Sequence, residues 1–343
     1  MKILKTAIVG ILALITFSQT ACFGSQSTTV NTNLVAKSNW LQNPDASSVG
    51  EVYERNVYDV AFQSTIPEDS TKAYLTANLS GSLITVLEKS SYNGEACYKF
   101  STELKVEGEY IYTASKKATV NDVVTSEAYF LGLSDKLAPL YSKKSLHSTV
   151  PAVSDAIIDG AVFGTMEYTV ETTYNRESKE AHVVVACGEN ASDNFKVNNS
   201  DEIIKDYSSS GTFFDNECFM FIPRAADLNE KNGFSAYFNT ISTLENKLQK
   251  MYLSLNSSNP TSTIEIANLV TDATGTKGEN KSYTVFNVTL SISNTFSGSA
   301  IELFYSTEPN SYRTLVRMST QIAYSSGKLV YTLKSTSRKQ PQA

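Results

Sequence analysis

Apolar and polar residues alternate along most of the chain, in segments of about 8 to 15 residues that end at polar turns. A period of two is typical of β-strands with one buried face, and this spacing favours antiparallel strands over alternating strands and helices. The clearest example is residues 166–174 (MEYTVETTY), with residues 180–187 (EAHVVVAC) as the expected antiparallel partner. The pattern predicts a mainly β protein: one large curved antiparallel sheet (a half-barrel or clamshell) or two facing sheets, with one or two short helices.

Other strands are expected where Thr, Val, Ile, Tyr and Phe gather between turn residues. Asn93-Gly94 is the best hairpin turn, because both residues tolerate positive φ. Gly108 is expected to join two separate strands, and Pro139 to interrupt the pattern because it lacks an N–H. The expected strands are residues 50–62 (with a bulge), 73–89, 96–106, 109–115, 120–130, 262–270, 282–293, 300–306, 313–324 and 328–334, while residues 244–255 fit either a strand or a short helix.

One segment, GTFFDNECFMFIPR, has the features of a short helix. Asp215 can accept hydrogen bonds from the free N–H groups of a first turn. Phe214 and Phe219 have the spacing of a hydrophobic staple, and Pro223 would kink or end the helix about two turns later. We therefore expect a helix over about 215–228.

Arg224 follows this apolar segment and needs an acidic partner if it is buried. Asp215 or Glu217, about two turns away on the expected helix, is the partner that the spacing offers. A solvated arginine at the end of the helix is the alternative.

The N-terminus has a different pattern. Lys2 and Lys5 precede an apolar run over residues 8–17, which is too short to span a bilayer comfortably, and small residues precede Cys22. This resembles a bacterial lipoprotein signal, in which the chain is cut before Cys22 and the cysteine is lipidated, although Gln19 stands where such signals favour Leu. We expect an extracytoplasmic protein attached to a bacterial cell membrane by this lipid; ordinary secretion and an uncleaved anchor are the alternatives.

The N-terminal signal and the strand pattern together divide the chain into segments. We expect order to begin between Leu34 and Asp45, and a break near 211–240 would separate the body into two halves. The expected segments are a signal peptide over 1–21, a flexible tether over 22–38, a β-rich ectodomain over 39–335 and a disordered tail over 336–343.

Charge argues against two classes of partner. The chain carries a net charge of −6, and loss of Lys2 and Lys5 with the signal leaves 27 Lys and Arg against 35 Asp and Glu, or −8. Nucleic-acid binding needs a clustered positive surface, and adsorption to anionic headgroups needs basic runs. The sequence has no such run, so we expect no nucleic-acid partner.

Three cysteines, Cys97, Cys187 and Cys218, remain after Cys22. Their odd number allows one disulfide with one free thiol, or no disulfide. None has a CxxC neighbour, so a metal knuckle is not expected. Isolated buried thiols are the favoured interpretation, because free cysteine packs as a small hydrophobic residue.

Catalytic motifs are missing from the chain. The two histidines, His147 in an expected loop and His182 on an expected strand, lack the spacing of HxH or HExxH, and GxSxG, GxGxxG and the P-loop pattern do not occur. We therefore expect no metal, no cofactor and no enzymatic activity. A hydrolase with an unmarked pair of carboxylates stays open as a minor alternative.

Aromatic residues are abundant, with 19 Tyr and 16 Phe. Tyrosines on one face of a sheet can line a concave site for sugars or acyl chains, although ordinary sheet packing also explains them. Those on expected strands are Tyr53, Tyr58, Tyr74, Tyr110, Tyr112, Tyr129, Phe130, Tyr168 and Tyr174.

Three stretches, residues 104–145, 165–187 and 212–228, resemble in their order the bacterial lipoprotein-carrier half-barrel families of the LolA and LppX type. In those families a strongly curved antiparallel sheet is closed on its concave side by helical segments around an apolar cavity. The resemblance implies non-enzymatic binding of an apolar or amphipathic ligand, such as a lipid or a lipoprotein.

The candidate ligand cavity lies beside Phe214, Phe219 and Phe221, and a contiguous apolar space there would support the first hypothesis. The alternative is a structural or adhesive envelope protein that binds polysaccharide or another envelope protein through exposed Tyr.

The lipid anchor can be tested directly. Cys22→Ser removes the acyl-acceptor thiol, and each buried CH₂ of an acyl chain contributes about 0.8 kcal/mol to membrane binding. We expect this variant in the soluble fraction after cell lysis, whereas the wild type needs detergent. Membrane binding of Cys22→Ser without detergent would show the lipid assignment to be wrong.

Overall fold

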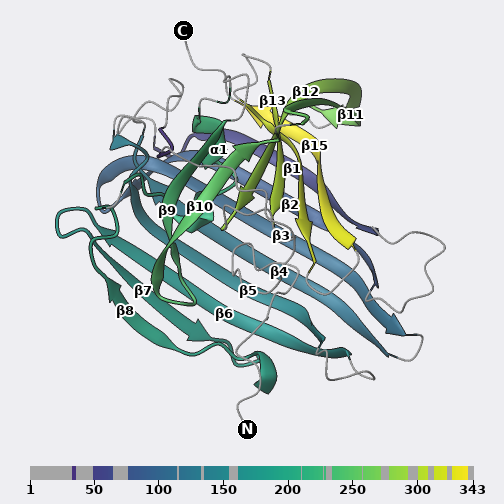
Figure 1. Cartoon of the computed structure of the whole chain (residues 1–343), viewed down its shortest axis with the longest axis horizontal. Coiled ribbons are helices and arrows are strands. Elements are labelled where there is room, and N and C mark those ends of the chain that lie inside the picture. Colours follow the sequence, from purple (N-terminus) through teal and green to yellow (C-terminus); the bar gives the residue numbers. More distant parts are fainter. Residues whose placement is uncertain are drawn as a thin grey trace.

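The computed structural model describes residues 33–35, 49–64, 76–113, 116–132, 135–153, 161–209, 211–226, 228, 234–256, 258–271, 278–292, 300–307, 313–322 and 327–338. These residues form a single sheet of fifteen strands (Figure 1). All strand pairs are antiparallel apart from one parallel bridge between Val270 and Ser335. The sheet is strongly curved, so the predicted mainly β fold with a half-barrel sheet is confirmed.

The first eight strands follow one another as hairpins in chain order. The turn between the second and third contains Asn93 and Gly94 with φ of 51° and 84°, as predicted. The predicted bulge in the first strand lies between Val57 and Tyr58. The bounds are β1 (Val52–Ser64), β2 (Thr76–Tyr92), β3 (Glu95–Thr113), β4 (Lys116–Phe130), β5 (Pro139–Val153), β6 (Ala161–Asn175), β7 (Glu180–Cys187) and β8 (Ser200–Ile204).

The remaining strands continue the same sheet from its other side. The last strand in the chain pairs with β1 over eleven residue pairs, so the segment near 211–240 does not divide the sheet into two. The ambiguous segment 244–255 contains a strand. The bounds are β9 (Ser235–Ser242), β10 (Lys247–Leu255), β11 (Thr261–Val270), β12 (Gly278–Ser291), β13 (Ile301–Ser306), β14 (Leu315–Gln321) and β15 (Gly327–Arg338).

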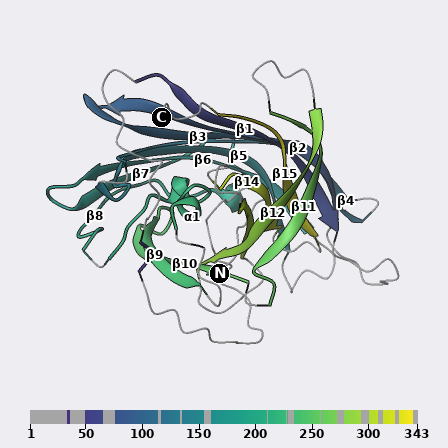
Figure 2. The ribbon, with the colours of Figure 1, turned by 90° about the horizontal axis from the view of Figure 1, so that it is seen from above.

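The chain between β8 and β9 enters the concave side of the sheet. Figure 2 shows α1 (Ile222–Ala225) between strands β1–β7 on one side and β9 and β10 on the other. We call residues 211–226 together with Leu228 the plug. A short 3₁₀-helix, η3 (Asp193–Phe195), lies outside it, between β7 and β8.

The helix predicted over 215–228 is only partly formed. The plug instead contains a 3₁₀ turn, η4 (Asn216–Cys218), followed by the four residues of α1. Asp215 caps η4 as predicted, since its side chain accepts a hydrogen bond from the backbone N–H of Glu217 at 2.7 Å. Pro223 begins the second piece instead of ending the first, because proline is favoured where an N–H has no helical partner.

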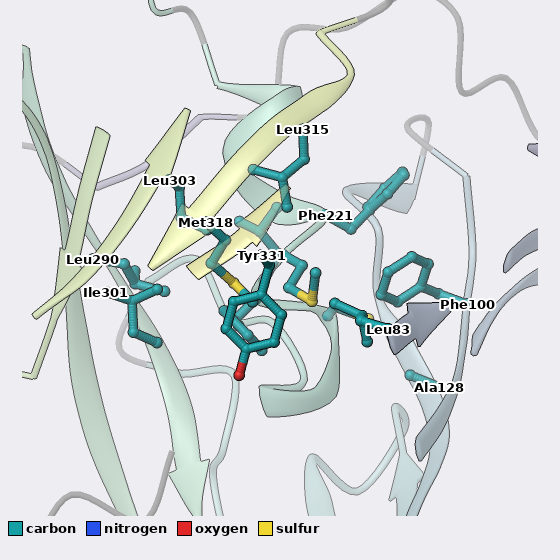
Figure 3. Close-up of a cluster of buried hydrophobic side chains, with 14 of the residues drawn as sticks. Leu83, Phe100, Ala128, Phe221, Leu290, Ile301, Leu303, Leu315, Met318 and Tyr331 are labelled. Atoms are coloured by element: carbon teal, nitrogen blue, oxygen red, sulfur yellow. The ribbon is translucent and has the colours of Figure 1, made fainter. Parts of the chain in front are cut away.

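The core lies between the concave face of the sheet and the plug. On β1 to β6 every second residue is buried, and the plug adds its own apolar side chains to the same cluster. Figure 3 shows Phe221 of the plug beside Phe100 of β3, with side chains of β13 and β14 nearby. The two rings lie 5.8 Å apart between centroids. Side chains of the plug therefore pack against the concave face of the sheet.

Four other predictions differ from the structure. β3 is one continuous strand through Gly108, and His147 lies on β5 instead of in a loop. β15 runs to Arg338, so the pairing of Glu54 with Arg338 orders residues that we assigned to a disordered tail. The strands β5, β8 and β9 were not predicted, because their alternation is broken by lysine, serine and asparagine.

Gly108 allows β2 and β3 to approach closely where the sheet bends. Its φ is +136°, and a Cβ added there would overlap the carbonyl oxygen of Asn78. Gly81, on the opposite strand, has the same relation to the carbonyl oxygen of Lys105. Glycine in a strand interior is typical of such close backbone approaches.

Gly108→Ala should therefore lower the free energy of unfolding by both conformational strain and overlap. The matched control is Gly94→Ala, where φ is +84° and the space around the new methyl group is open. We expect about 1–2 kcal/mol for the control and about 1–3 kcal/mol more for Gly108→Ala, measured by urea unfolding. Equal losses would show that β2 and β3 can separate at no cost.

Candidate functional site

A row of polar residues crosses the concave face of the sheet. The register of β1 to β5 aligns one residue from each strand, and all five are buried. We call Asn56, Thr85, Thr102, Ser126 and Lys144 the polar row. The hydroxyls of Thr102 and Ser126 lie 2.8 Å apart, within hydrogen-bond distance. The buried face of a sheet is ordinarily apolar, and buried polar side chains need hydrogen-bond partners. The polar row lies where the plug provides such partners.

Two acidic residues of the plug face the polar row and its neighbours. Glu217 lies 3.6 Å from the ammonium of Lys144 and also bonds to Ser126. Asp215 accepts a hydrogen bond from the hydroxyl of Tyr174 at 2.6 Å. Burial raises the pKa of both carboxyls, and these polar partners offset part of that effect. The acidic residues thus seat the plug on the sheet, which explains why they interrupt an apolar segment.

Arg224 anchors the other end of the plug. Its guanidinium donates two hydrogen bonds to Glu54 of β1, with N–O distances of 2.7 and 2.8 Å, and Arg338 of β15 donates to the same carboxylate. Burial alone would raise the pKa of Glu54, but the charges and hydrogen bonds of the two arginines lower it to about 2. The carboxylate therefore stays ionised although it is 3% exposed.

The expected partners of Arg224 were wrong. Asp215 and Glu217 lie near it in sequence, but the broken helix directs them to the polar row. The actual partner, Glu54, is 170 residues away in the chain. Sequence spacing reports neighbours on one helix only, so it could not identify a partner on another strand.

The three phenylalanines predicted to line a ligand cavity are all buried in the core. Phe214, Phe219 and Phe221 are 2%, 4% and 1% exposed. Among the described residues, the space beside Phe214 and Phe221 has a volume of about 10 Å³. That volume admits one water molecule at most. The space beside these two rings is therefore too small for an apolar ligand.

The larger hollow lies on the other face of the sheet. It has a volume of about 300 Å³ and crosses β2 to β5. Most of its lining, including Ile84 and Val86, alternates with the buried residues and so faces away from the plug. We call it the outer groove; it is lined by Ile84, Val86, Ser101, Thr102, Glu103, Thr125, Ser126, Glu127, Lys143 and Ser145.

Charged residues of the outer groove are paired. Lys99 lies 2.9 Å from Glu127 and also lies above the ring of Tyr129, 5.4 Å from its centroid. Lys143 lies 2.5 Å from Glu171 of the neighbouring strand. The groove therefore offers hydrogen-bond donors and acceptors without a strong net charge, which suits a neutral polar ligand.

Three tyrosines form a cluster next to the outer groove. Tyr92 stacks on Tyr141, with ring centroids 5.4 Å apart and an angle of 18° between the planes. Tyr129 lies 5.5 Å from Tyr92 and 6.0 Å from Tyr141. All three are partly exposed, and one side of the cluster packs on Cys97 and its apolar neighbours. We call Tyr92, Tyr129 and Tyr141 the tyrosine cluster.

The sequence identified only one member of this cluster. Tyr129 was among the strand aromatics, whereas Tyr53, Tyr58, Tyr110, Phe130, Tyr168 and Tyr174 are core residues, Tyr112 packs against the core and Tyr74 lies outside the described residues. Tyr92 precedes the hairpin turn and Tyr141 follows Pro139. Finding Tyr92 and Tyr141 required the register of β2 to β5, which sequence alternation does not determine.

The cysteines and histidines considered in the sequence analysis lie at separate places in the structure. Cys97, Cys187 and Cys218 are free thiols, and two of them are buried. His147 lies 2.8 Å from Glu167, and His182, on a strand as expected, is exposed and lies 2.5 Å from Asp201. Cys22 lies outside the described residues.

The described residues contain neither a cluster of metal ligands nor a membrane-spanning helix. In these ranges, His, Cys, Asp and Glu side chains form no group of three that could hold a metal ion. No helix in the described part of the chain is long and apolar enough to span a bilayer.

No family model and no curated protein matches the chain. Among solved structures, it is similar to the β-barrel-like protein of the domain of unknown function DUF1849 from Brucella abortus. That match has 9% sequence identity and a TM-score of 0.45, and it covers 83% of this chain and 97% of the other. A similarity of this degree indicates no function.

Replacement of Arg224 tests the seating of the plug. Arg224→Met keeps most of the side-chain volume but removes the bidentate partner of a buried carboxylate, and breaking such a pair costs about 3–5 kcal/mol. The control is Arg176→Met, which removes an ion pair on the surface, in which one guanidinium nitrogen contacts both carboxylate oxygens of Glu95; such pairs are worth about 0–1 kcal/mol. Urea unfolding should therefore separate the two variants clearly. Equal stability would mean that Arg338 alone suffices for Glu54.

Proposed function

We propose that the protein is a lipid-anchored extracytoplasmic protein that binds a glycan, without changing it chemically, on the outer face of β2 to β5. Cys22 provides the anchor, and the tyrosine cluster with the outer groove provides the binding site. The observation that supports this proposal best is the stacked, partly exposed tyrosine cluster directly beside a polar groove.

Sugars have two kinds of surface, and the site matches both. The faces of a pyranose ring carry C–H groups, which pack on the apolar face of an aromatic ring. The rim carries hydroxyls, which need hydrogen-bond partners when they lose water. Tyr92 and Tyr141 offer ring surface, while Ser101, Thr125 and Ser145 offer hydroxyls in the groove.

The shape of the site favours an extended ligand. The next row of outward-facing residues after the row of Glu127 and Lys143 contains Tyr129 and Tyr141, because residues two apart in a strand share one face. The outer groove and the tyrosine cluster thus form one continuous surface across β2 to β5. Several sugar units of a chain could occupy it together, which suits a polysaccharide of the cell envelope.

The interior is a weaker candidate for the binding site. Its free volume of about 10 Å³ beside Phe214 and Phe221 compares with about 300–1,000 Å³ for ordinary ligand pockets. Opening it would expose the ionised Glu54 and the apolar face of the plug together. The structure therefore favours the outer surface over the lipid-binding interior that the half-barrel resemblance implies.

The test uses the full chain in detergent, applied to an array of purified oligosaccharides and polysaccharides. We expect binding to a subset of glycans, at least about tenfold weaker affinity for Tyr141→Ala, and recovery of the glycan intact. The matched control is Tyr252→Ala, a partly exposed tyrosine on β10 that also contacts a second tyrosine ring.

Three results would contradict the proposal. The first is an array without any bound glycan, the second is an equal loss in Tyr141→Ala and Tyr252→Ala, and the third is cleavage of the glycan. Lipid that copurifies with the protein, and that Tyr141→Ala retains, would instead indicate a binding site in the interior. Solvent extraction and mass spectrometry detect such a lipid.

A further inference from the structure

The residues that follow the proposed anchor are attached to a particular strand. Asn33 forms a parallel bridge with Tyr237 of β9, and the backbone N–H of Leu34 donates to the carbonyl oxygen of Tyr237 at 2.8 Å. Leu34 is 2% exposed and belongs to the main core cluster. Residues 33–35, which we assigned to the flexible tether, are therefore part of the folded body.

This attachment shortens the connection to the membrane. Asn33 lies eleven positions after Cys22, and this connection can span at most about 40 Å. A folded body of this size is about 50 Å across. Asn33 and the part of β9 beside it therefore stay within about 40 Å of the bilayer, which is less than the width of the body.

The surface beside this attachment has residues suited to a lipid headgroup region. The rings of Tyr237 and Tyr252 lie 6.4 Å apart on neighbouring strands, and the ammonium of Lys250 lies 4.6 Å from the centroid of Tyr237. Leu248 and Val35 are 36% and 59% exposed. Tyrosine and lysine, with an apolar stem and a polar end, are favoured at membrane interfaces.

Charge differs between this surface and the side of the sheet formed by β6 to β8. Residues 235–255, the β9–β10 hairpin, carry two lysines and one glutamate, for a net charge of +1. Residues 161–204, which include β6 to β8, carry eight acidic and three basic residues, for a net charge of −5. Once the lipid holds the chain at an anionic bilayer, residues 161–204 are repelled more strongly than the β9–β10 hairpin.

We infer that the outer face of the β9–β10 hairpin, together with Val35, lies against the lipid headgroups. This inference rests on the lipid anchor of the proposed function. Figure 2 shows β9 and β10 on the opposite side of α1 from β3, β5 and β6, so the tyrosine cluster and the outer groove then face away from the membrane. The orientation leaves the glycan site open to the envelope or the medium.

The test places a fluorescent reporter on each side of the full, lipidated chain. Tyr252→Trp reports on the hairpin and Tyr141→Trp is the matched control, with the wild-type signal of Trp40, the only native tryptophan, subtracted from both. The proteins are reconstituted into vesicles of phosphatidylethanolamine and phosphatidylglycerol with brominated acyl chains. We expect quenching of residue 252 to be at least about twofold stronger than that of residue 141.

A second substitution tests the charge. Lys250→Glu in the Tyr252→Trp protein should reduce the quenching, because it reverses the charge of the hairpin from +1 to −1. Thermal unfolding of each variant followed by circular dichroism confirms that the fold is kept.

Vesicle flotation separates the two levels of the proposal. Flotation with equal quenching at residues 252 and 141 would overturn the orientation and leave the anchor standing. Failure to float would overturn the anchor and the orientation together, while glycan binding in detergent would be unaffected.

Discussion

The carboxylate of Glu54 is the point on which the assembly of the molecule depends. It brings together β1, the plug and β15, three parts of the chain that are far apart in sequence. A buried charge is tolerated only when its partners are all present, so Glu54 requires the plug to be inserted and the last strand to be paired at the same time. One ionic contact thereby couples the closure of the sheet to the filling of its interior.

The polar row extends this coupling across the concave face. An apolar plug on an apolar sheet could settle in several registers, whereas hydroxyls, Lys144 and two plug carboxylates fit together in one. The same arrangement fills the interior with the protein's own side chains. Strand alternation places the tyrosine cluster and the outer groove on the outside of the sheet, where we propose that the ligand binds.

Sequence patterns anticipated the strands best where alternation was regular. The β6–β7 hairpin and the Asn93–Gly94 turn were predicted correctly, because local φ preferences and two-residue periodicity determine them. Asp215 was recognised as a cap for the same local reason. β5 was missed because its inward positions include Ser142, Lys144 and Ser148, which resemble a surface pattern. Carboxylates of the plug are the partners of Ser142 and Lys144, and Asp122 of β4 is the partner of Ser148. The pairing of Arg224 with Glu54 and the tyrosine cluster depend on strand register, and a single sequence does not determine register between distant strands.

The strand order also has a consequence for how this chain folds. β1 to β8 are consecutive hairpins, so each can form on its predecessor as the polypeptide emerges, with short loops and a small entropic cost of closure. β1, in contrast, exposes one edge until β15 arrives some 275 residues later, and β9 pairs with residues 33–35 only after most of the body exists. Long-range strand pairing of this kind is slow and leaves an edge open to association with other chains. About half of the sheet can thus form quickly, whereas the free edge of β1 stays unpaired until the C-terminal strand has been synthesised.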